Sequence, residues 1–281
     1  MKDHATMLPP TQWRREARVA GEVFAVELRR TLWGKRTIYY ALLAAMPLLL
    51  FGLLALVAVA RGSGFGLGEH LVQFNAIFQL LFVQALLYFS CSEIFVSLIR
   101  GEVLDRTLHY AFLSPIRREA LLAGKYLAGV AATALLFVPA TVVSYVLAVL
   151  PAGRQASLAH LSGSGLAAVA AYAAIVVLGA LSYGALCLLF GVVFRTPSYA
   201  VGLFWVWEYV SFILPPFLKR FGIAHHLAAL LPLPVAEGPL AIVSETPSAL
   251  ASVPALLVGA AALLAVAGWR LRKLEISYGA E

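Results

Sequence analysis

Six long apolar segments divide this sequence, and they restrict the chain to one class of fold. A helix needs roughly 20 apolar residues to cross the hydrocarbon core of a bilayer, and five of the segments are longer than that. Charged residues make up 12% of the chain, against about 25% in soluble domains. We therefore expect an all-α integral membrane protein with six transmembrane helices. The expected spans are Thr37–Ala60, Leu71–Ile99, Tyr126–Leu150, Leu166–Phe194, Ser198–Leu214 and Ala249–Trp269.

The distribution of Lys and Arg predicts how these spans are oriented. With six spans, 17 of the 21 Lys and Arg residues fall in segments on one side of the membrane. Cytoplasmic segments carry the excess of positive charge in membrane proteins, so both termini are expected in the cytoplasm. The same rule explains the net charge of +7 without a nucleic-acid partner. The four residues expected on the outer side are Arg61, Arg154, Lys219 and Arg220.

The N-terminal region, residues 1–36, contains an amphipathic helix between Arg14 and Arg36. A basic amphipathic helix just before a span is expected to lie in the membrane interface, with its arginines near lipid phosphates. The alternative is a solvated helix that docks on protein. The residues expected to contact the interface are Phe24, Leu28 and Leu32 on the apolar side, and Arg15, Arg18 and Arg29 on the basic side.

The stretch from Arg100 to Lys125 is the most charged interior part of the sequence. Each of its charges would cost a few kcal/mol in the core of a bilayer, so the stretch is expected to leave the membrane on the cytoplasmic side. Ser114-Pro115 interrupts the helical pattern and can start a second helix. We expect a projecting helix–turn–helix elbow that docks in a groove of a partner protein. Its coupling residues are Arg100, Glu102, Asp105, Arg106, Pro115, Arg117, Arg118, Glu119 and Lys125.

The connection Pro215–Ser248 contains short apolar pieces broken by Pro232, Pro234 and Pro239. These pieces are too short to span a bilayer and too apolar for a free loop. We expect short re-entrant helices between the fifth and sixth spans, packed on the bundle in the outer leaflet. The transmembrane domain then covers residues 37–273, and a cytoplasmic tail follows at residues 274–281.

Glu208 lies in the middle of the expected fifth span, and an ionisable residue at that depth is a functional hypothesis by default. Its neighbours Trp205, Tyr209 and Phe212 are expected to face the same way and to line a substrate path with it. The alternative is that Glu208 forms hydrogen bonds between helices and serves packing.

The expected second span carries three further polar residues that are candidates for the same path. Asn75, Gln79 and Glu93 are expected on one face, because the 18 residues from Asn75 to Glu93 make five helical turns. Glu93 lies near the cytoplasmic end of that span, where an ion pair with Arg100 is the more natural role. Asn75 and Gln79 remain as the path residues of this span.

The sequence contains no motif for nucleotide binding or for common hydrolytic chemistry. It lacks the phosphate loop G-x-x-x-x-G-K-[ST], the zinc helix H-E-x-x-H and the nucleophile elbow G-x-S-x-G. Among six histidines only His225 and His226 are adjacent, and adjacent residues point to different sides of a helix. We therefore expect no catalytic residue, no metal site and no cofactor bound by this chain.

The charged stretch contains a pattern of residues that is found in one family of membrane proteins. The pattern is Gly101-Glu102, Thr107-Leu108, Leu113-Ser114-Pro115, Arg117, Glu119 and Gly124-Lys125. With this pattern, one amphipathic helix and six spans, the chain resembles the membrane permease subunit of type-2 ATP-binding-cassette (ABC) exporters. The resemblance covers nearly the whole chain in layout. That family often has Gly before the Thr-Leu pair, where this chain has Arg106.

The resemblance implies a non-catalytic transport subunit in a bacterial cytoplasmic (inner) membrane, surrounded by membrane lipid. A separate ABC ATPase subunit would bind ATP and Mg and would drive the spans through residues 100–125. The permease would act as a homodimer, or as a heterodimer with a second permease, and would export a hydrophobic or amphiphilic substrate.

Two alternatives use Glu208 as the functional ionisable group. The first is an ion-coupled secondary transporter, and the second is a membrane-embedded enzyme. The absence of metal and nucleophile motifs weighs against the enzyme. The lack of inverted halves and the charged elbow weigh against the ion-coupled carrier.

Overall fold

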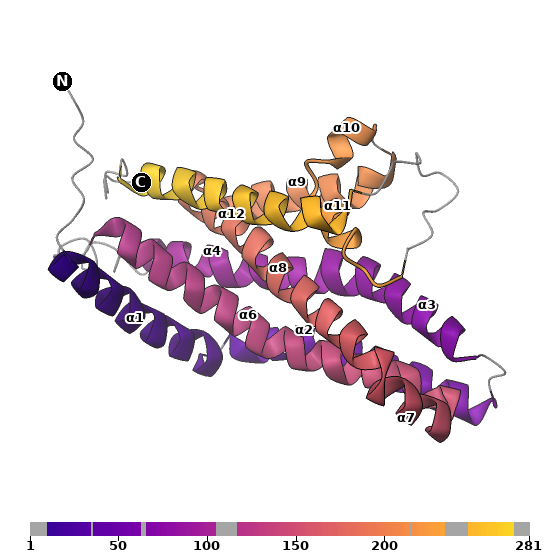
Figure 1. Ribbon diagram of the computed structural model, residues 1–281. Coiled ribbons are helices and arrows are strands. Elements are labelled where there is room, and N and C mark those ends of the chain that lie inside the picture. The colour runs from indigo at the N-terminus through magenta and orange to yellow at the C-terminus, as the bar shows by residue number, and fades with distance from the viewer. Residues whose placement is uncertain are drawn as a thin grey trace.

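The computed structural model describes residues 10–34, 36–62, 66–104, 117–213, 215–233 and 247–272. Within these ranges the chain is almost wholly helical and contains no strand. The helices run side by side in an elongated bundle (Figure 1). This part of the chain therefore confirms the prediction of an all-α fold.

Five helices in the described residues are long and apolar enough to cross a membrane. They coincide with five of the six predicted spans, and the chain is therefore a multi-pass membrane protein. Their bounds are α2 Thr37–Ala60, the continuous helix α3 Leu67–Ile77, η1 Phe78–Leu87 and α4 Tyr88–Leu104, then α6 Arg118–Val149, α8 Ser164–Val193 and α12 Ala249–Arg272.

The shorter helices lie before, between and after these spans. The predicted fifth span folds as α9, a helix of 14 residues, followed by a single 3₁₀ turn, so one continuous spanning helix is not formed there. The predicted short helices after it are present as α10 and α11. The bounds are α1 Pro10–Trp33, η2 Leu150–Ala152, α7 Arg154–Ser162, α9 Pro197–Val210, η3 Ser211–Ile213, α10 Pro216–Lys219 and α11 Ile223–Ala228.

The C-termini of α4, α8 and α12 meet the N-terminus of α6 at one end of the bundle, which we call the charged end (Figure 1). There Lys125 of α6 donates to the carbonyl of Leu98 in α4 at 3.1 Å, and Arg118 of α6 donates to the carbonyl of Leu271 in α12 at 2.7 Å. The last turns of α8 approach α4 closely, because a Cβ on Gly191 would lie 3.5 Å from the α4 backbone. The charge-rich connection from α4 to α6 therefore begins and ends at this end.

A cluster of buried aromatic rings lies between α3, η1, α6 and α8, toward the end of the bundle opposite the charged end. The ring of Tyr172 lies 5.0 Å from that of Phe74 and 4.8 Å from that of Phe78, both with edge-to-face geometry. Tyr145 contacts Phe74 in the same way at 5.1 Å. All four side chains are buried. Edge-to-face pairs stabilise a fixed arrangement beyond the burial of apolar area, so these helices form the rigid core.

Few apolar side chains of the outer helices α2 and α12 are buried. Leu42, Leu49 and Leu53 of α2 are each more than half exposed, as are Leu250 and Val258 of α12. Exposed apolar faces on helices of this length suit contact with lipid or with another membrane protein.

Candidate functional sites: the charged end and the polar latch

The charged end carries the residues predicted to couple the chain to a partner. Asp105, Arg106 and Pro115 lie outside the described residues, and so does the side chain of Glu102. The helix–turn–helix shape of the elbow therefore stays a prediction. The helix after the predicted turn is not separate from the next span, because α6 runs without a break from Arg118 to Val149. A displacement at the start of α6 would therefore be carried directly into the membrane.

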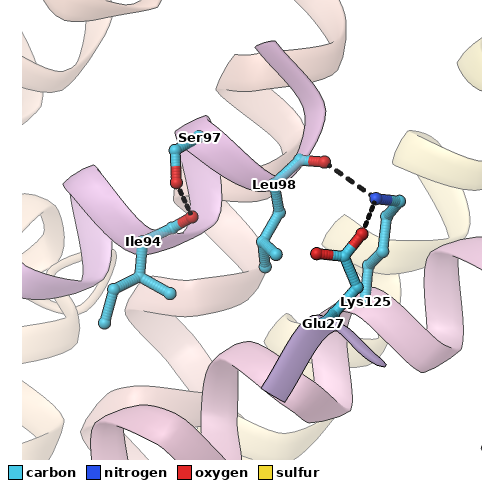
Figure 2. Close-up of polar contacts among 5 residues, drawn as sticks. All are labelled: Glu27, Ile94, Ser97, Leu98 and Lys125. Carbon is cyan, nitrogen blue, oxygen red and sulfur yellow. Dashed lines mark hydrogen bonds and ion pairs between the residues drawn. The ribbon is translucent and has the colours of Figure 1, made fainter. Parts of the chain in front are cut away.

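Lys125, predicted at the surface of the elbow, is buried with only 1% of its side chain exposed. Its Nζ lies 2.5 Å from a carboxylate oxygen of Glu27 in α1 and donates to the carbonyl oxygen of Leu98 in α4 (Figure 2). Direct contact with a partner protein is therefore not open to Lys125 in this structure. We call Glu27, Leu98 and Lys125 the three-helix junction, since they join α1, α4 and α6.

The three-helix junction depends on a close approach of α1 to α6. Gly124 precedes Lys125, and a Cβ at this position would lie 2.7 Å from the carbonyl oxygen of Ala20. Real Cβ atoms do not approach backbone oxygen so closely, so glycine is required for this contact. Figure 1 shows α1 beside the N-terminal half of α6. Close backbone contact lets the short Glu27 carboxylate reach the Lys125 ammonium.

The predicted interfacial helix is therefore docked on protein along one side. Arg18 and Arg29 are exposed, whereas Phe24, Leu28 and Leu32 are half-buried. This pattern agrees with the amphipathic face predicted from the sequence. The side chain of Arg15 lies outside the described residues, and the position of α1 relative to lipid stays a prediction.

Two further coupling candidates connect α6 to α12. The guanidinium of Arg118 donates to the carbonyl oxygens of Leu271 at 2.7 Å and Arg272 at 3.0 Å. These carbonyls belong to the last turn of α12 and have no partner within the helix, so Arg118 caps that turn. Glu119 forms an ion pair with the side chain of Arg272. Both groups of that pair are well exposed, so the pair itself contributes little stability.

Of the remaining coupling candidates, Arg117 is exposed at the N-cap position of α6. Arg100, near the end of α4, is half-buried. Apart from Arg100, the coupling residues whose side chains are described divide into two groups. Lys125, Arg118 and Glu119 fasten helices of this chain to each other, and Arg117 presents positive charge at the surface of the charged end.

The polar residues predicted to line a substrate path hold one segment of the chain in place, and their role in a path stays a prediction. Asn75 donates to the carbonyl oxygen of Leu233 at 2.7 Å and accepts a hydrogen bond from the Tyr172 hydroxyl at 2.8 Å. Gln79 donates to the carbonyl oxygen of Ala224 at 3.3 Å. Both side chains are buried. They therefore fix the backbone of the segment that follows α9.

Glu208 of α9 also binds the backbone of the segment that follows α9. One carboxylate oxygen accepts the N–H of Ile223 and the other accepts the N–H of Ala224, each at 2.7 Å. The hydroxyl of Tyr183 donates to the second oxygen at 3.1 Å. We call Asn75, Gln79 and Glu208 the polar latch. The alternative interpretation of Glu208, hydrogen bonding that serves packing, describes this geometry.

The predicted common face of α9 is not formed. Glu208 is 2% exposed, whereas its neighbour Tyr209 is 47% exposed. Successive residues of a helix point about 100° apart, because a turn holds about 3.6 residues. Trp205 is half-buried, donates to the carbonyl oxygen of Gln84 at 3.0 Å and stacks on Tyr209. The side chain of Phe212 lies outside the described residues.

The sequence pattern missed Glu27 and Tyr183, which complete the two sites. Glu27 carried a signal, because it lies seven residues after Ala20, on the same side of an otherwise apolar stripe. An acidic residue in such a stripe predicts a buried partner of opposite charge. Tyr183 carried no comparable signal, since a tyrosine in an apolar span is common core material.

Neither a metal site nor a known relative identifies the chain further. Among the described residues, no group of three His, Cys, Asp or Glu side chains could hold a metal ion. His226 instead contacts the carbonyl oxygen of Arg220 at 2.9 Å and the hydroxyl of Ser252 at 3.4 Å. No protein-family model matches the chain, and no curated protein matches it. What the chain does must therefore be inferred from its own residues and contacts.

Proposed function

We propose that this chain is the membrane permease subunit of an ATP-driven exporter, worked from its charged end by a separate ABC ATPase. The observation that supports the proposal is the way the charged end is built. The start of α6, directly after the connection from α4, is fastened to α1 through Glu27 and Lys125, and to α12 through Arg118. A force applied to this connection would move four helices as one unit, which is the behaviour a coupling elbow requires.

In this proposal, the partner ATPase supplies the energy for transport by hydrolysing ATP. The sequence has no phosphate loop, so ATP and Mg are assigned to the partner ATPase. The exposed Arg117 offers that partner a positive contact at the charged end. The sequence pattern predicts the basic tip of the elbow at Arg117 and Arg118.

The proposed unit contains two permease chains in a bacterial cytoplasmic membrane, either identical or related. The exposed apolar side chains of α2 and α12 provide surfaces for such a pairing and for lipid. Two chains that rock against each other would expose a path to each side in turn. An apolar surrounding of this kind suits a hydrophobic or amphiphilic substrate.

The test is recovery of the partner with the tagged chain. The chain is purified in mild detergent from its native membranes, and the co-purifying proteins are identified by mass spectrometry. We expect an ABC ATPase and ATP hydrolysis in the eluate. The variant Arg117→Glu should reduce recovery of the ATPase at least tenfold, because it reverses an exposed charge at the charged end.

Arg154→Glu is the matched control, because Arg154 is also exposed but begins α7 at the opposite end of the bundle. This variant should retain the ATPase. Equal recovery with Arg117→Glu would contradict the proposed docking role. ATP hydrolysis by the chain after complete removal of its partners would contradict the assignment as a permease subunit.

A further inference from the structure

A cavity of about 170 Å³ lies between the last turns of α2, the first turns of α3 and the end of α6. It belongs to the end of the bundle opposite the charged end and is separate from the polar latch. Its walls contain apolar and polar side chains, and these line different parts of the cavity. Apolar groups form the inner part, and a cation and two other polar groups lie toward the helix ends.

The inner part is apolar and preformed. Phe51 of α2 and Phe74 of α3 line it, with ring centroids 4.9 Å apart, and both are almost completely buried. Phe74 is held in turn by Tyr145 and Tyr172 of the aromatic cluster. Leu54 completes the wall on the α2 side. Because these rings are fixed by packing, the cavity does not have to be opened by a ligand.

The outer part carries Arg61, His70 and Gln73. Arg61 is exposed directly after the last turn of α2, and His70 is buried with 6% of its surface exposed. A positive charge after a helix C-terminus also interacts favourably with the helix dipole. This interaction explains the arginine at position 61 but does not explain the cavity beside it. The nearby acid Glu69 accepts the N–H of Gly66 at 3.0 Å and so stabilises the start of α3.

We propose that this cavity binds an amphiphile with an acyl chain against Phe51 and Phe74 and an anionic headgroup at Arg61. An arginine guanidinium pairs with phosphate through charge-assisted hydrogen bonds, so Arg61 can hold an anionic headgroup. An apolar cavity of about 150 Å³ holds a benzene molecule, and this cavity has a similar volume. It can therefore hold a segment of an acyl chain that is about as large as benzene. The surrounding bilayer supplies such molecules as anionic phospholipids. The inference is independent of whether the chain is driven by an ATPase.

The test is lipid binding to the purified full chain, measured by native mass spectrometry. Phosphatidylglycerol, phosphatidylcholine and oleate are titrated separately. We expect tight phosphatidylglycerol binding and at least tenfold weaker phosphatidylcholine binding. Arg61→Glu removes the headgroup contact and Ala58→Trp fills the cavity, so each should weaken phosphatidylglycerol binding at least tenfold. Arg154→Glu, an exposed arginine at the same end but outside the cavity, should leave binding unchanged.

The outcomes separate the possible sources of the ligand. Arg61→Gln provides a milder version of the charge change if Arg61→Glu or Ala58→Trp does not fold. Tight oleate binding without phosphatidylglycerol binding, lost in the same variants, would support the site with a free fatty acid as its ligand. Equal binding of phosphatidylglycerol and phosphatidylcholine, or unchanged binding in the Arg61 and Ala58 variants, would overturn the proposal.

Discussion

At the scale of single residues, the ion pair between Lys125 and Glu27 allows a sharp test of the three-helix junction. The variant Lys125→Met leaves the Glu27 carboxylate buried without its ammonium partner. Removing one member of a buried pair costs about 3–5 kcal/mol, so we expect a large loss of stability. The thermal unfolding temperature of the variant in detergent, compared with that of the wild type, measures this loss of stability.

The double variant Glu27→Leu/Lys125→Met provides the matched comparison. Replacing both charges with apolar groups of similar volume is often neutral or stabilising, so most of the loss should be recovered. Arg29→Ala, on the exposed side of α1, should have little effect. If the double variant were as unstable as Lys125→Met, the ion pair would not explain the stability of the junction.

At the residue scale the sequence left two interpretations of Glu208 open, a substrate path and hydrogen bonding that serves packing. The contacts of Glu208 with Ile223 and Ala224 fit the second interpretation, and its place in a substrate path stays a prediction. Its partners were not predictable, because they are backbone N–H groups of Ile223 and Ala224, which no side-chain pattern marks. The sequence pattern predicts Lys125 at the surface, because no residue near it in the chain indicates a buried partner. Its acidic partner Glu27 lies 98 residues earlier in the chain. Pairing over that distance depends on how α1 packs on α6.

At the scale of helices, Gly124 sets the distance between α1 and α6. Gly124→Ala places a Cβ 2.7 Å from the carbonyl oxygen of Ala20, and a backbone atom cannot move aside cheaply. We expect α1 to detach from α6, so trypsin should cleave within α1 at least tenfold faster. Gly259→Ala is the control, because a Cβ at Gly259 in α12 meets nothing within 4 Å. Slow cleavage in Gly124→Ala would show that α1 is held by other contacts.

The positions of five spans were predictable from the sequence, because these segments are long and apolar enough to be recognised as membrane-crossing helices. The interior of the second span was not predictable. Residues 78–87 form a π-helix, whose wider i→i+5 turns change the phase of the faces on either side. Asn75 and Gln79 are therefore buried while Glu93 is exposed, against the prediction of one shared face.

At the scale of the whole molecule, the six-crossing topology stays a prediction, and the direction of the helices shows where it can be tested. Both α8 and α12 end at the charged end, so residues 194–248 must bring the chain back to the opposite end (Figure 1). Glu208 lies about 17 Å along α9 at 1.5 Å per residue, near the middle of a bilayer of about 30 Å. There the polar latch binds the segment that continues toward Leu233. The predicted fifth crossing would have to be made in pieces, because α9 with 14 residues is too short to span a bilayer alone.

Labelling from one side of the membrane tests this return crossing. Single cysteines at Arg195 and Ser248, both exposed, would flank the proposed crossing. Cysteines at Arg117 and Arg154 mark the charged end and the opposite end. Cys91 and Cys187 are buried, so they should react little with an impermeant maleimide. We expect Arg195 to label with Arg117 and Ser248 with Arg154, because the latched segment brings the chain across. Labelling of Arg195 and Ser248 from the same side would mean that this part of the chain enters and leaves the membrane on one face, and the six-crossing topology would have to be abandoned.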